Sequence, residues 1–163
     1  MTRLFMTTLL LSLIALNAAQ STSRAKVELS PAAVDSAAFG ERSENAPLIV
    51  KVEVLLDRAH YSPGQIDGKD GENFRKALKA FQQANNLAST GKVDAETWNA
   101  LTANVSEPVL KSYAITEADV AGPFDRRIPH GLEQAAKLRG LSYKDSVEAL
   151  SEKFHMSEHL LRS

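Results

Sequence analysis

Residues 61–67, YSPGQID, and residues 87–94, LASTGKVD, share the motif Gly-x-(Ile/Val)-Asp. In each copy a Gly can take the positive φ that reverses the chain, an apolar residue can enter the core, and an Asp can cap the next element of the chain. An aromatic residue opens the helix expected after each copy, Phe74 in the first case and Trp98 in the second. The same turn is used twice, which predicts two helix–turn units that bury each other's apolar faces, since one unit is too small to fold alone.

The segments around these turns have helical periodicity. Apolar residues of the segment 48–59 fall on one face, and the same spacing recurs over 74–84 in a helix that begins at Glu72 or Asn73. A third, short helix opens at Asp94, a good N-cap, where Val93 can pack against Trp98 as a hydrophobic staple. The residues predicted to be structural are Gly64, Phe74, Phe81, Gly91, Asp94, Trp98 and Leu101.

The motifs in residues 47–103 resemble those of a known family. They are Ile66-Asp67-Gly68-x-x-Gly71-x-Asn73, Ala80-Phe81-Gln82, Leu87, Gly91-x-Val93-Asp94 and Thr97-Trp98-x-x-Leu101. In order and spacing this segment is similar to the bacterial peptidoglycan-binding domain of the three-helix type. It departs from that pattern at Asn73, where the family often has Thr, and in the first helix, where a Gln is frequent. The resemblance implies a small three-helix domain that attaches exported cell-wall enzymes to peptidoglycan.

A peptidoglycan ligand offers sugar hydroxyls, N-acetyl groups and stem-peptide carboxylates. A shallow cleft that binds it needs an aromatic platform together with neutral and positive hydrogen-bond donors. We therefore expect the ligand-binding residues among the polar and aromatic side chains near the repeated turns, with Tyr61 and Arg75 lining the groove. An alternative for Asp67 is that it caps a turn. The candidates are Tyr61, Gln65, Asp67, Asn73, Arg75 and Gln82.

The N-terminal residues predict export. Arg3 precedes an uncharged apolar run from Leu4 to Leu16, followed by the small residues Ala18 and Ala19, which is typical of a signal peptide over residues 1–19. An uncleaved membrane anchor is the alternative. We expect a periplasmic or extracellular protein with no membrane contact after cleavage. Residues 20–46 are rich in Ser, Ala and charge, which predicts a largely disordered linker.

Residues 104–131 are predicted to form a connector that contains one extended strand over 109–116. A short helix is expected over 132–139. A capping box of Asp145 and Glu148 opens another helix, and Ser157 caps the last one. The run Ala149-Leu150-Ser151-Glu152-Lys153-Phe154-His155-Met156-Ser157 and the pair Leu160-Leu161 follow. With these residues the segment 143–163 resembles the two-helix part of a lysin motif.

The domain order resembles the N-terminal half of bacterial L,D-transpeptidases, which use a Cys nucleophile in a separate C-terminal domain. This chain of 163 residues has no Cys. The predicted fold is mainly α: a three-helix peptidoglycan-binding bundle, a helical segment over 132–163 truncated relative to a lysin motif, a signal peptide and flexible linkers.

Composition excludes several functions. With 19 Lys and Arg against 20 Asp and Glu, the chain lacks the basic excess of a nucleic-acid binder. His155 and His159 are four residues apart, but Ser157 as an N-cap breaks the helix that would align them, so we expect no metal site. We also expect no cofactor and no catalytic residue.

The predicted function is an exported, non-catalytic peptidoglycan-binding protein, with a cell-wall enzyme as a candidate partner. The alternatives are the targeting half of an L,D-transpeptidase and a periplasmic protein-interaction module.

Overall fold

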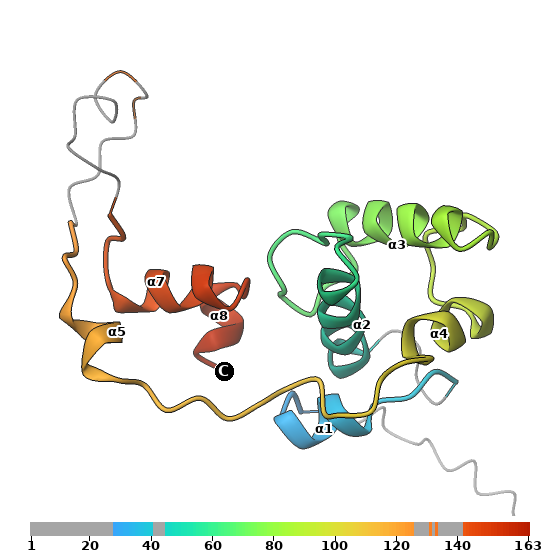
Figure 1. Cartoon of the computed structure of the whole chain (residues 1–163), viewed down its shortest axis with the longest axis horizontal. Helices are drawn as coiled ribbons and strands as arrows, with labels where there is room; N and C mark the ends of the chain where they lie inside the picture. The colour runs from blue at the N-terminus through green and yellow to red at the C-terminus, as the bar shows by residue number, and fades with distance from the viewer. Residues whose placement is uncertain (1–27, 41–44, 126–130, 132, 134–141) are drawn as a thin grey trace, which may run out of the picture.

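The structure is a computed structural model that describes residues 28–40, 45–125, 131, 133 and 142–163. This part of the chain is mainly α, as predicted, and contains no strand. The predicted signal peptide and most of the helix predicted at 132–139 lie outside the described residues. The helices are α1 (Pro31–Ser36), α2 (Ala46–Arg58), α3 (Glu72–Ala84), α4 (Ala95–Thr102), α5 (Glu117–Ala121), α7 (Ser146–Lys153) and α8 (Glu158–Leu161) (Figure 1).

Helices α2, α3 and α4 form the predicted three-helix bundle. Helix α2 begins at Ala46, because Asn45 accepts a hydrogen bond from the Leu48 amide at 2.9 Å and so caps it. Helix α4 is capped as predicted by Asp94, whose carboxylate accepts from the Thr97 amide at 2.8 Å. The core of the bundle is apolar, and its predicted members Phe74, Phe81 and Leu101 are all buried, with Trp98 packed against them.

Two loops connect the helices of the bundle. The first loop, residues 59–71, joins α2 to α3, and the second loop, residues 85–94, joins α3 to α4. Gly64 and Gly91 have φ values of 86° and 69°, so both glycines take the left-handed conformation that the motif predicts. The repeated motif thus makes the two chain reversals of the bundle.

Helix α1 corrects the prediction of a disordered linker over residues 20–46. Ser30 caps it, Pro31 stands in its first turn, and Val34 is 2 % exposed against the bundle. The Lys51 ammonium of α2 donates to the carbonyl oxygens of Asp35 and Ala37 at 2.7 and 2.9 Å. Lys51 lies 14 and 16 residues from the carbonyl groups that it binds. Because these contacts are not local, the composition of residues 20–46 wrongly predicted disorder.

The connector contains no strand over 109–116, so that prediction is wrong. Val109 is buried, and its amide donates to the Asp35 carboxylate at 2.9 Å, but residues 110–116 form no strand or bridge with a neighbouring segment. An extended backbone without a partner cannot form a sheet. Helix α5 then begins after Thr116, whose amide and hydroxyl both donate to the Asp119 carboxylate at 2.8 Å; the prediction for the connector did not include this helix.

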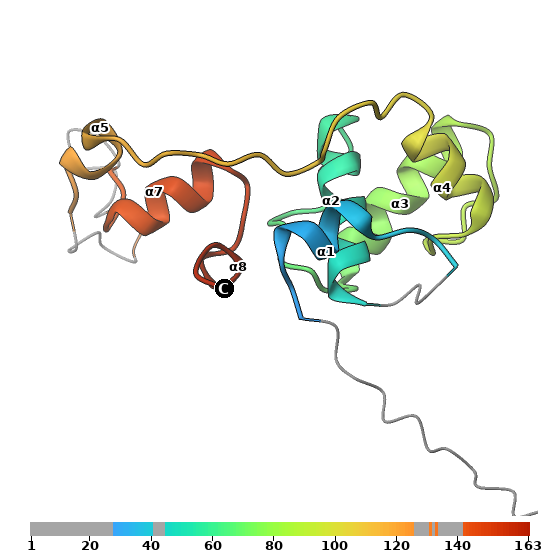
Figure 2. The same ribbon diagram turned by 90° about the horizontal axis from the view of Figure 1, so that it is seen from below.

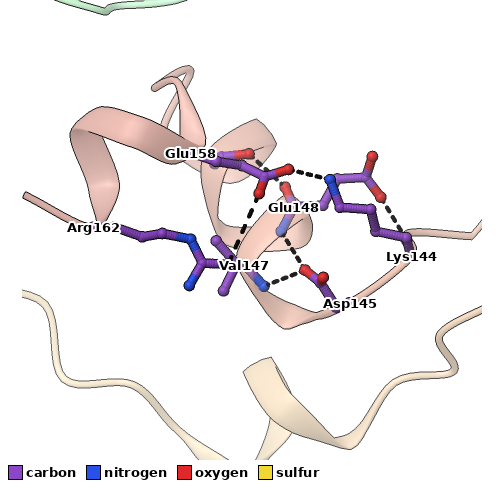
Figure 3. Close-up of polar contacts among 7 residues, drawn as sticks. Lys144, Asp145, Val147, Glu148, Glu158 and Arg162 are labelled. Atoms are coloured by element: carbon purple, nitrogen blue, oxygen red, sulfur yellow. Dashed lines mark hydrogen bonds and ion pairs between the residues drawn. The ribbon is translucent and has the colours of Figure 1, made fainter. Parts of the chain in front are cut away.

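Helices α7 and α8 form the predicted C-terminal pair, and Figure 3 shows its polar contacts. Asp145 caps α7 by accepting from the amides of Val147 and Glu148, at 3.0 and 2.9 Å. Glu148 does not complete the predicted capping box, because its carboxylate accepts from the Lys144 amide rather than from that of Asp145. The Lys144 ammonium pairs with Glu158 of α8 and so joins the two helices (Figure 3).

The helix pair packs against the bundle at the first loop. Leu160 of α8 belongs to the same buried cluster as Ile66 of that loop, and Met156 packs against this cluster. Ile66 and Met156 form a parallel β-bridge. Figure 1 shows the first loop between α2 and the α7–α8 pair, and Figure 2 shows the connector crossing between the two regions. One core therefore extends from Val34 to Leu160, beyond the predicted bounds 47–103.

Candidate functional site: a groove beside the first loop

A buried side chain from the preceding helix holds each loop of the bundle. For the second loop it is Gln82 of α3, which has no exposed surface. Its amide oxygen accepts from the Gly91 amide at 2.9 Å, and its amide nitrogen lies within 3.0 Å of Thr90 Oγ1, the Lys92 carbonyl and Thr97 Oγ1. An amide is both donor and acceptor, so Gln82 satisfies loop groups of both kinds.

For the first loop the buried side chain is Glu53 of α2, which is 1 % exposed. Its Oε2 accepts from the amides of Asp67 and Gly68, at 3.2 and 2.9 Å. Burial disfavours the charged carboxylate and raises the pKa of Glu53 to about 7, although the two amide donors act in the opposite direction. The first loop is therefore held by a group that titrates near neutrality.

A groove of about 390 Å³ lies between this loop and the start of α3. It is mostly polar and includes a carboxamide from each side, Gln65 of the loop and Asn73 of α3. Both residues are exposed, and neither side chain is hydrogen-bonded to any described residue. Two amide groups are thus available to a ligand. The lining residues are Glu53, Pro63, Gln65, Asp67, Lys69, Gly71, Glu72, Asn73 and Phe74.

Asp67 contributes to the groove and also stabilises its own turn. Its carboxylate accepts from the Lys69 amide at 3.0 Å and pairs with the Lys69 ammonium at 3.2 Å. The sequence-based alternative, that Asp67 caps a turn, is thereby confirmed. Three of the six predicted ligand-binding residues, Gln65, Asp67 and Asn73, meet at this groove.

The other three predicted residues lie elsewhere. Tyr61 is half-buried with its ring edge-on to Phe81, at 5.5 Å between centroids. Arg75 is exposed, but its guanidinium binds both carboxylate oxygens of Asp70, at 2.7 and 3.0 Å. Neither lines the groove, contrary to the expectation for this pair. Gln82 is corrected to a structural residue, because its whole side chain is inside the bundle.

Sequence reasoning missed Glu53 and Lys69. Glu53 had a usable signal, because it falls within the apolar stripe of α2, between Val52 and Leu56. A charged residue at such a position is buried only with partners, and here the partners are backbone amides of a loop 14 and 15 residues away. Lys69 had no signal that distinguishes it from other surface lysines.

Metal-ligating side chains do not cluster in the described part of the chain: no group of three or more His, Cys, Asp or Glu residues is arranged to hold an ion. His155 instead pairs with Asp57 of α2, with Nδ1 and Oδ2 at 2.9 Å. This places His155 at the contact between the helix pair and the bundle.

Comparison with known proteins finds one family model that matches the bundle. Residues 45–101 match the family model described as a putative peptidoglycan binding domain. The match spans α2, α3 and nearly all of α4, including both loops and every residue that lines the groove. It supports peptidoglycan binding by this segment and an association with the cell wall. No curated protein matches the chain. Among the described residues, no helix is long and apolar enough to cross a membrane.

Proposed function

We propose that this chain is an exported, non-catalytic protein that binds peptidoglycan through the groove beside the first loop. The observation that carries the proposal is the pair of exposed carboxamides, Gln65 and Asn73, on opposite sides of a groove within the segment that matches the peptidoglycan-binding family. Carboxamides donate and accept, so they can pair with both the hydroxyls and the N-acetyl groups of a glycan.

The chemistry of the groove favours a neutral polar ligand. Lys69 and Asp67 neutralise each other, and Glu72 pairs with Lys76 at 2.7 Å. Phe74 adds an apolar residue to the lining, but it is buried and offers little surface for stacking. We infer that sugar groups contribute more to recognition than stem-peptide carboxylates do, because Arg75, the cation expected to bind a carboxylate, is held by Asp70.

The non-catalytic part of the proposal rests on the absence of Cys from the sequence and on the character of the groove. Glu53 has an unusual pKa, but both of its donors are backbone amides of the loop, and its position inside α2 gives it a structural task. The export part rests on the apolar run from Leu4 to Leu16.

Co-sedimentation with purified sacculi tests the binding proposal. We expect the double variant Gln65→Ala/Asn73→Ala to lose about tenfold or more in affinity, because two carboxamide contacts at roughly 1 kcal/mol each are removed. The matched control is Gln83→Ala/Asn99→Ala, which removes the same two residue types from exposed positions of α3 and α4 outside the groove. Equal binding by the two double variants would refute the assignment of the groove. A wild-type chain that stays in the supernatant would instead favour a protein-interaction module.

We propose as a second candidate that the chain is related to the targeting half of an L,D-transpeptidase. The order of the segments supports it, since the helix pair α7 and α8 follows the bundle and the connector as the resemblance implies. The reading frame across the codon for Ser163, confirmed by the intact mass of the native product, tests this candidate: a frame that continues into a segment with Cys and His would favour it, and a frame that stops there would count against it.

A further inference from the structure

The first loop is fixed on two sides at consecutive residues. On one side, the Ile66 amide donates to the His155 carbonyl at 2.8 Å, and the Ser157 amide donates to the Ile66 carbonyl at 3.0 Å. On the other side, Glu53 accepts from the next two amides, those of Asp67 and Gly68. Every backbone amide from Ile66 to Gly68 is therefore engaged by a partner outside the loop.

The side chains alternate along this stretch as they do in a strand. Ile66 is 4 % exposed and points into the core, whereas Gln65 and Asp67 on either side of it line the groove. The position of Ile66 consequently determines where the two groove residues stand. A shift of the Ile66 backbone would displace one side of the groove relative to Asn73 on α3.

The turn between α7 and α8 supplies the partners of Ile66. His155 has a φ of 54°, a left-handed conformation that is uncommon for a residue other than Gly. In this turn the His155 carbonyl reaches the Ile66 amide, and its imidazole lies 2.9 Å from the Asp57 carboxylate. Leu160 completes the contact by entering the core cluster of the bundle. A turn held by two backbone hydrogen bonds, a contact between the His155 imidazole and the Asp57 carboxylate, and a buried side chain is a specific docking contact.

We propose that the turn between α7 and α8 positions the peptidoglycan-binding groove, with the backbone of His155 and Ser157 acting as positioning groups for Gln65 and Asp67. The inference rests on the proposed function of the groove. It assigns the C-terminal helix pair a task in ligand binding that requires no ligand contact of its own. The segment that matches the family model is then incomplete as a binding unit, because some of the groups that hold its loop lie more than 50 residues beyond residue 101.

The test removes one donor from this contact. Ser157 has a φ of −68°, which suits Pro, so Ser157→Pro deletes the amide that binds Ile66 without forcing the backbone away from its present φ. The matched control is Ser157→Ala, which keeps the amide and loses only the side-chain cap of α8, the bond from the Leu160 amide at 3.2 Å. A difference between the two variants therefore reports on the bond to Ile66.

Two readouts are measured on the full chain: amide hydrogen exchange at residues 66–68, and affinity for purified sacculi. We expect Ser157→Pro to speed exchange at these amides about tenfold and to weaken binding about fivefold, and Ser157→Ala to differ from wild type less than twofold in both. If Ser157→Pro binds sacculi as wild type does, or leaves exchange unchanged, the inference is wrong while the proposed function stands. If the wild-type chain does not bind sacculi, the proposed function fails, and exchange alone decides whether the turn positions the loop.

A second variant covers the case in which Ser157→Pro does not fold, as judged by circular dichroism. Asp57→Ala removes the carboxylate that contacts the His155 imidazole from the α2 side and leaves α8 intact. We expect it to speed exchange at the Ile66 amide about threefold. Exchange equal to that of wild type in this variant would overturn the inference.

Discussion

The two loops of the bundle share one motif but are held by different chemistry. In the second loop a neutral amide, Gln82, satisfies both donors and acceptors in a site with no exposed surface. In the first loop a carboxyl group, Glu53, accepts from two amides, and the remaining support comes from a separate helix pair. The second loop is thus complete within α3 and α4, whereas the first depends on a titratable group and on a distant segment. The first loop, whose support depends on the protonation of Glu53 and on the helix pair, is the one that lines the groove.

The comparison predicts its largest effect at Gln82. Gln82→Ala leaves the Gly91 amide and the Lys92 carbonyl without their partner inside the bundle. We expect a loss of about 3–4 kcal/mol in the free energy of unfolding, because buried polar groups that lose their partners cost about 1–3 kcal/mol each. Urea denaturation measures it, with Gln83→Ala, an exposed neighbour, as the control that changes stability by less than about 0.5 kcal/mol. A loss under about 1 kcal/mol for Gln82→Ala would contradict the role of this amide.

The next effect is the pH dependence that Glu53 confers. Its pKa is about 7 in the native chain against 4.5 as an ordinary value, so between these values the native state holds a proton that the unfolded state has lost. The stability due to Glu53 is full below pH 4.5, falls as the pH rises toward 7, and is constant above that. The expected total is about 3 kcal/mol from the difference in pKa.

The measurement is the free energy of unfolding from pH 4.5 to 7.5 for the wild type and Glu53→Gln. The amide variant keeps an acceptor for Asp67 and Gly68 but does not titrate, so its profile should lack the decline attributed to Glu53. Parallel profiles for the two proteins would show that Glu53 is not protonated in the native state. Gln82 is expected to add no pH dependence to the stability, because its amide does not titrate.

Replacing the motif glycine of each loop by Ala is expected to give a smaller difference in stability between the two loops. At Gly91 an added Cβ meets Lys79 Cε at 2.9 Å and the Arg75 carbonyl at 3.2 Å, whereas at Gly64 it meets the exposed Asn73 side chain at 3.2 Å. Both positions have positive φ, which costs a residue with a Cβ about 1 kcal/mol. We expect Gly91→Ala to lose about 2 kcal/mol and Gly64→Ala about 1 kcal/mol in thermal unfolding. A larger loss for Gly64→Ala than for Gly91→Ala would mean that the first loop leaves less space for an added Cβ than the second.

The smallest expected difference concerns the aspartates that end the two motifs. Asp94 caps α4 through both the amide and the hydroxyl of Thr97, and these bonds lower the pKa of Asp94. Asp94→Ala should lose about 1 kcal/mol at pH 7, and the difference from wild type should shrink as the pH falls below about 4. Asp67→Ala, which removes a turn bond at a partly exposed site, should lose about 0.5 kcal/mol or less. Equal losses at pH 7 would show that Asp94 and Asp67 contribute equally to the stability of the native state.

The bundle was predictable from the sequence because its determinants are local. Apolar spacing located α2, α3 and α4, and the caps at Asp94 and Ser157 were read from neighbouring residues. Helix α1 was missed because only Val34 of its six residues is buried, and the groups that hold it, Lys51 and Val109, are far away in the chain. A strand was predicted at 109–116 from composition alone, where the fold provides no partner.

Only part of the candidate site could be predicted, for a similar reason. Gln65, Asp67 and Asn73 lie in the repeated turn or next to it, so proximity in sequence was enough to find them. Arg75 does not line the groove, and its pairing with Asp70 depends on side-chain geometry that spacing does not show. Gln82 was misassigned because a polar residue in an amphipathic helix is normally exposed, and here the second loop covers it.

The contact between Asp35 and Val109 has a mechanical consequence. These residues flank the bundle in the chain, before α2 and after α4, yet the Asp35 carboxylate accepts directly from the Val109 amide, and Lys51 secures the end of α1 beside it. Tension applied along the chain from before Asp35 to beyond Val109 is therefore transmitted across this short link. The three helices of the bundle and the groove beside the first loop stay outside the path of a load applied at these two chain ends until the link breaks.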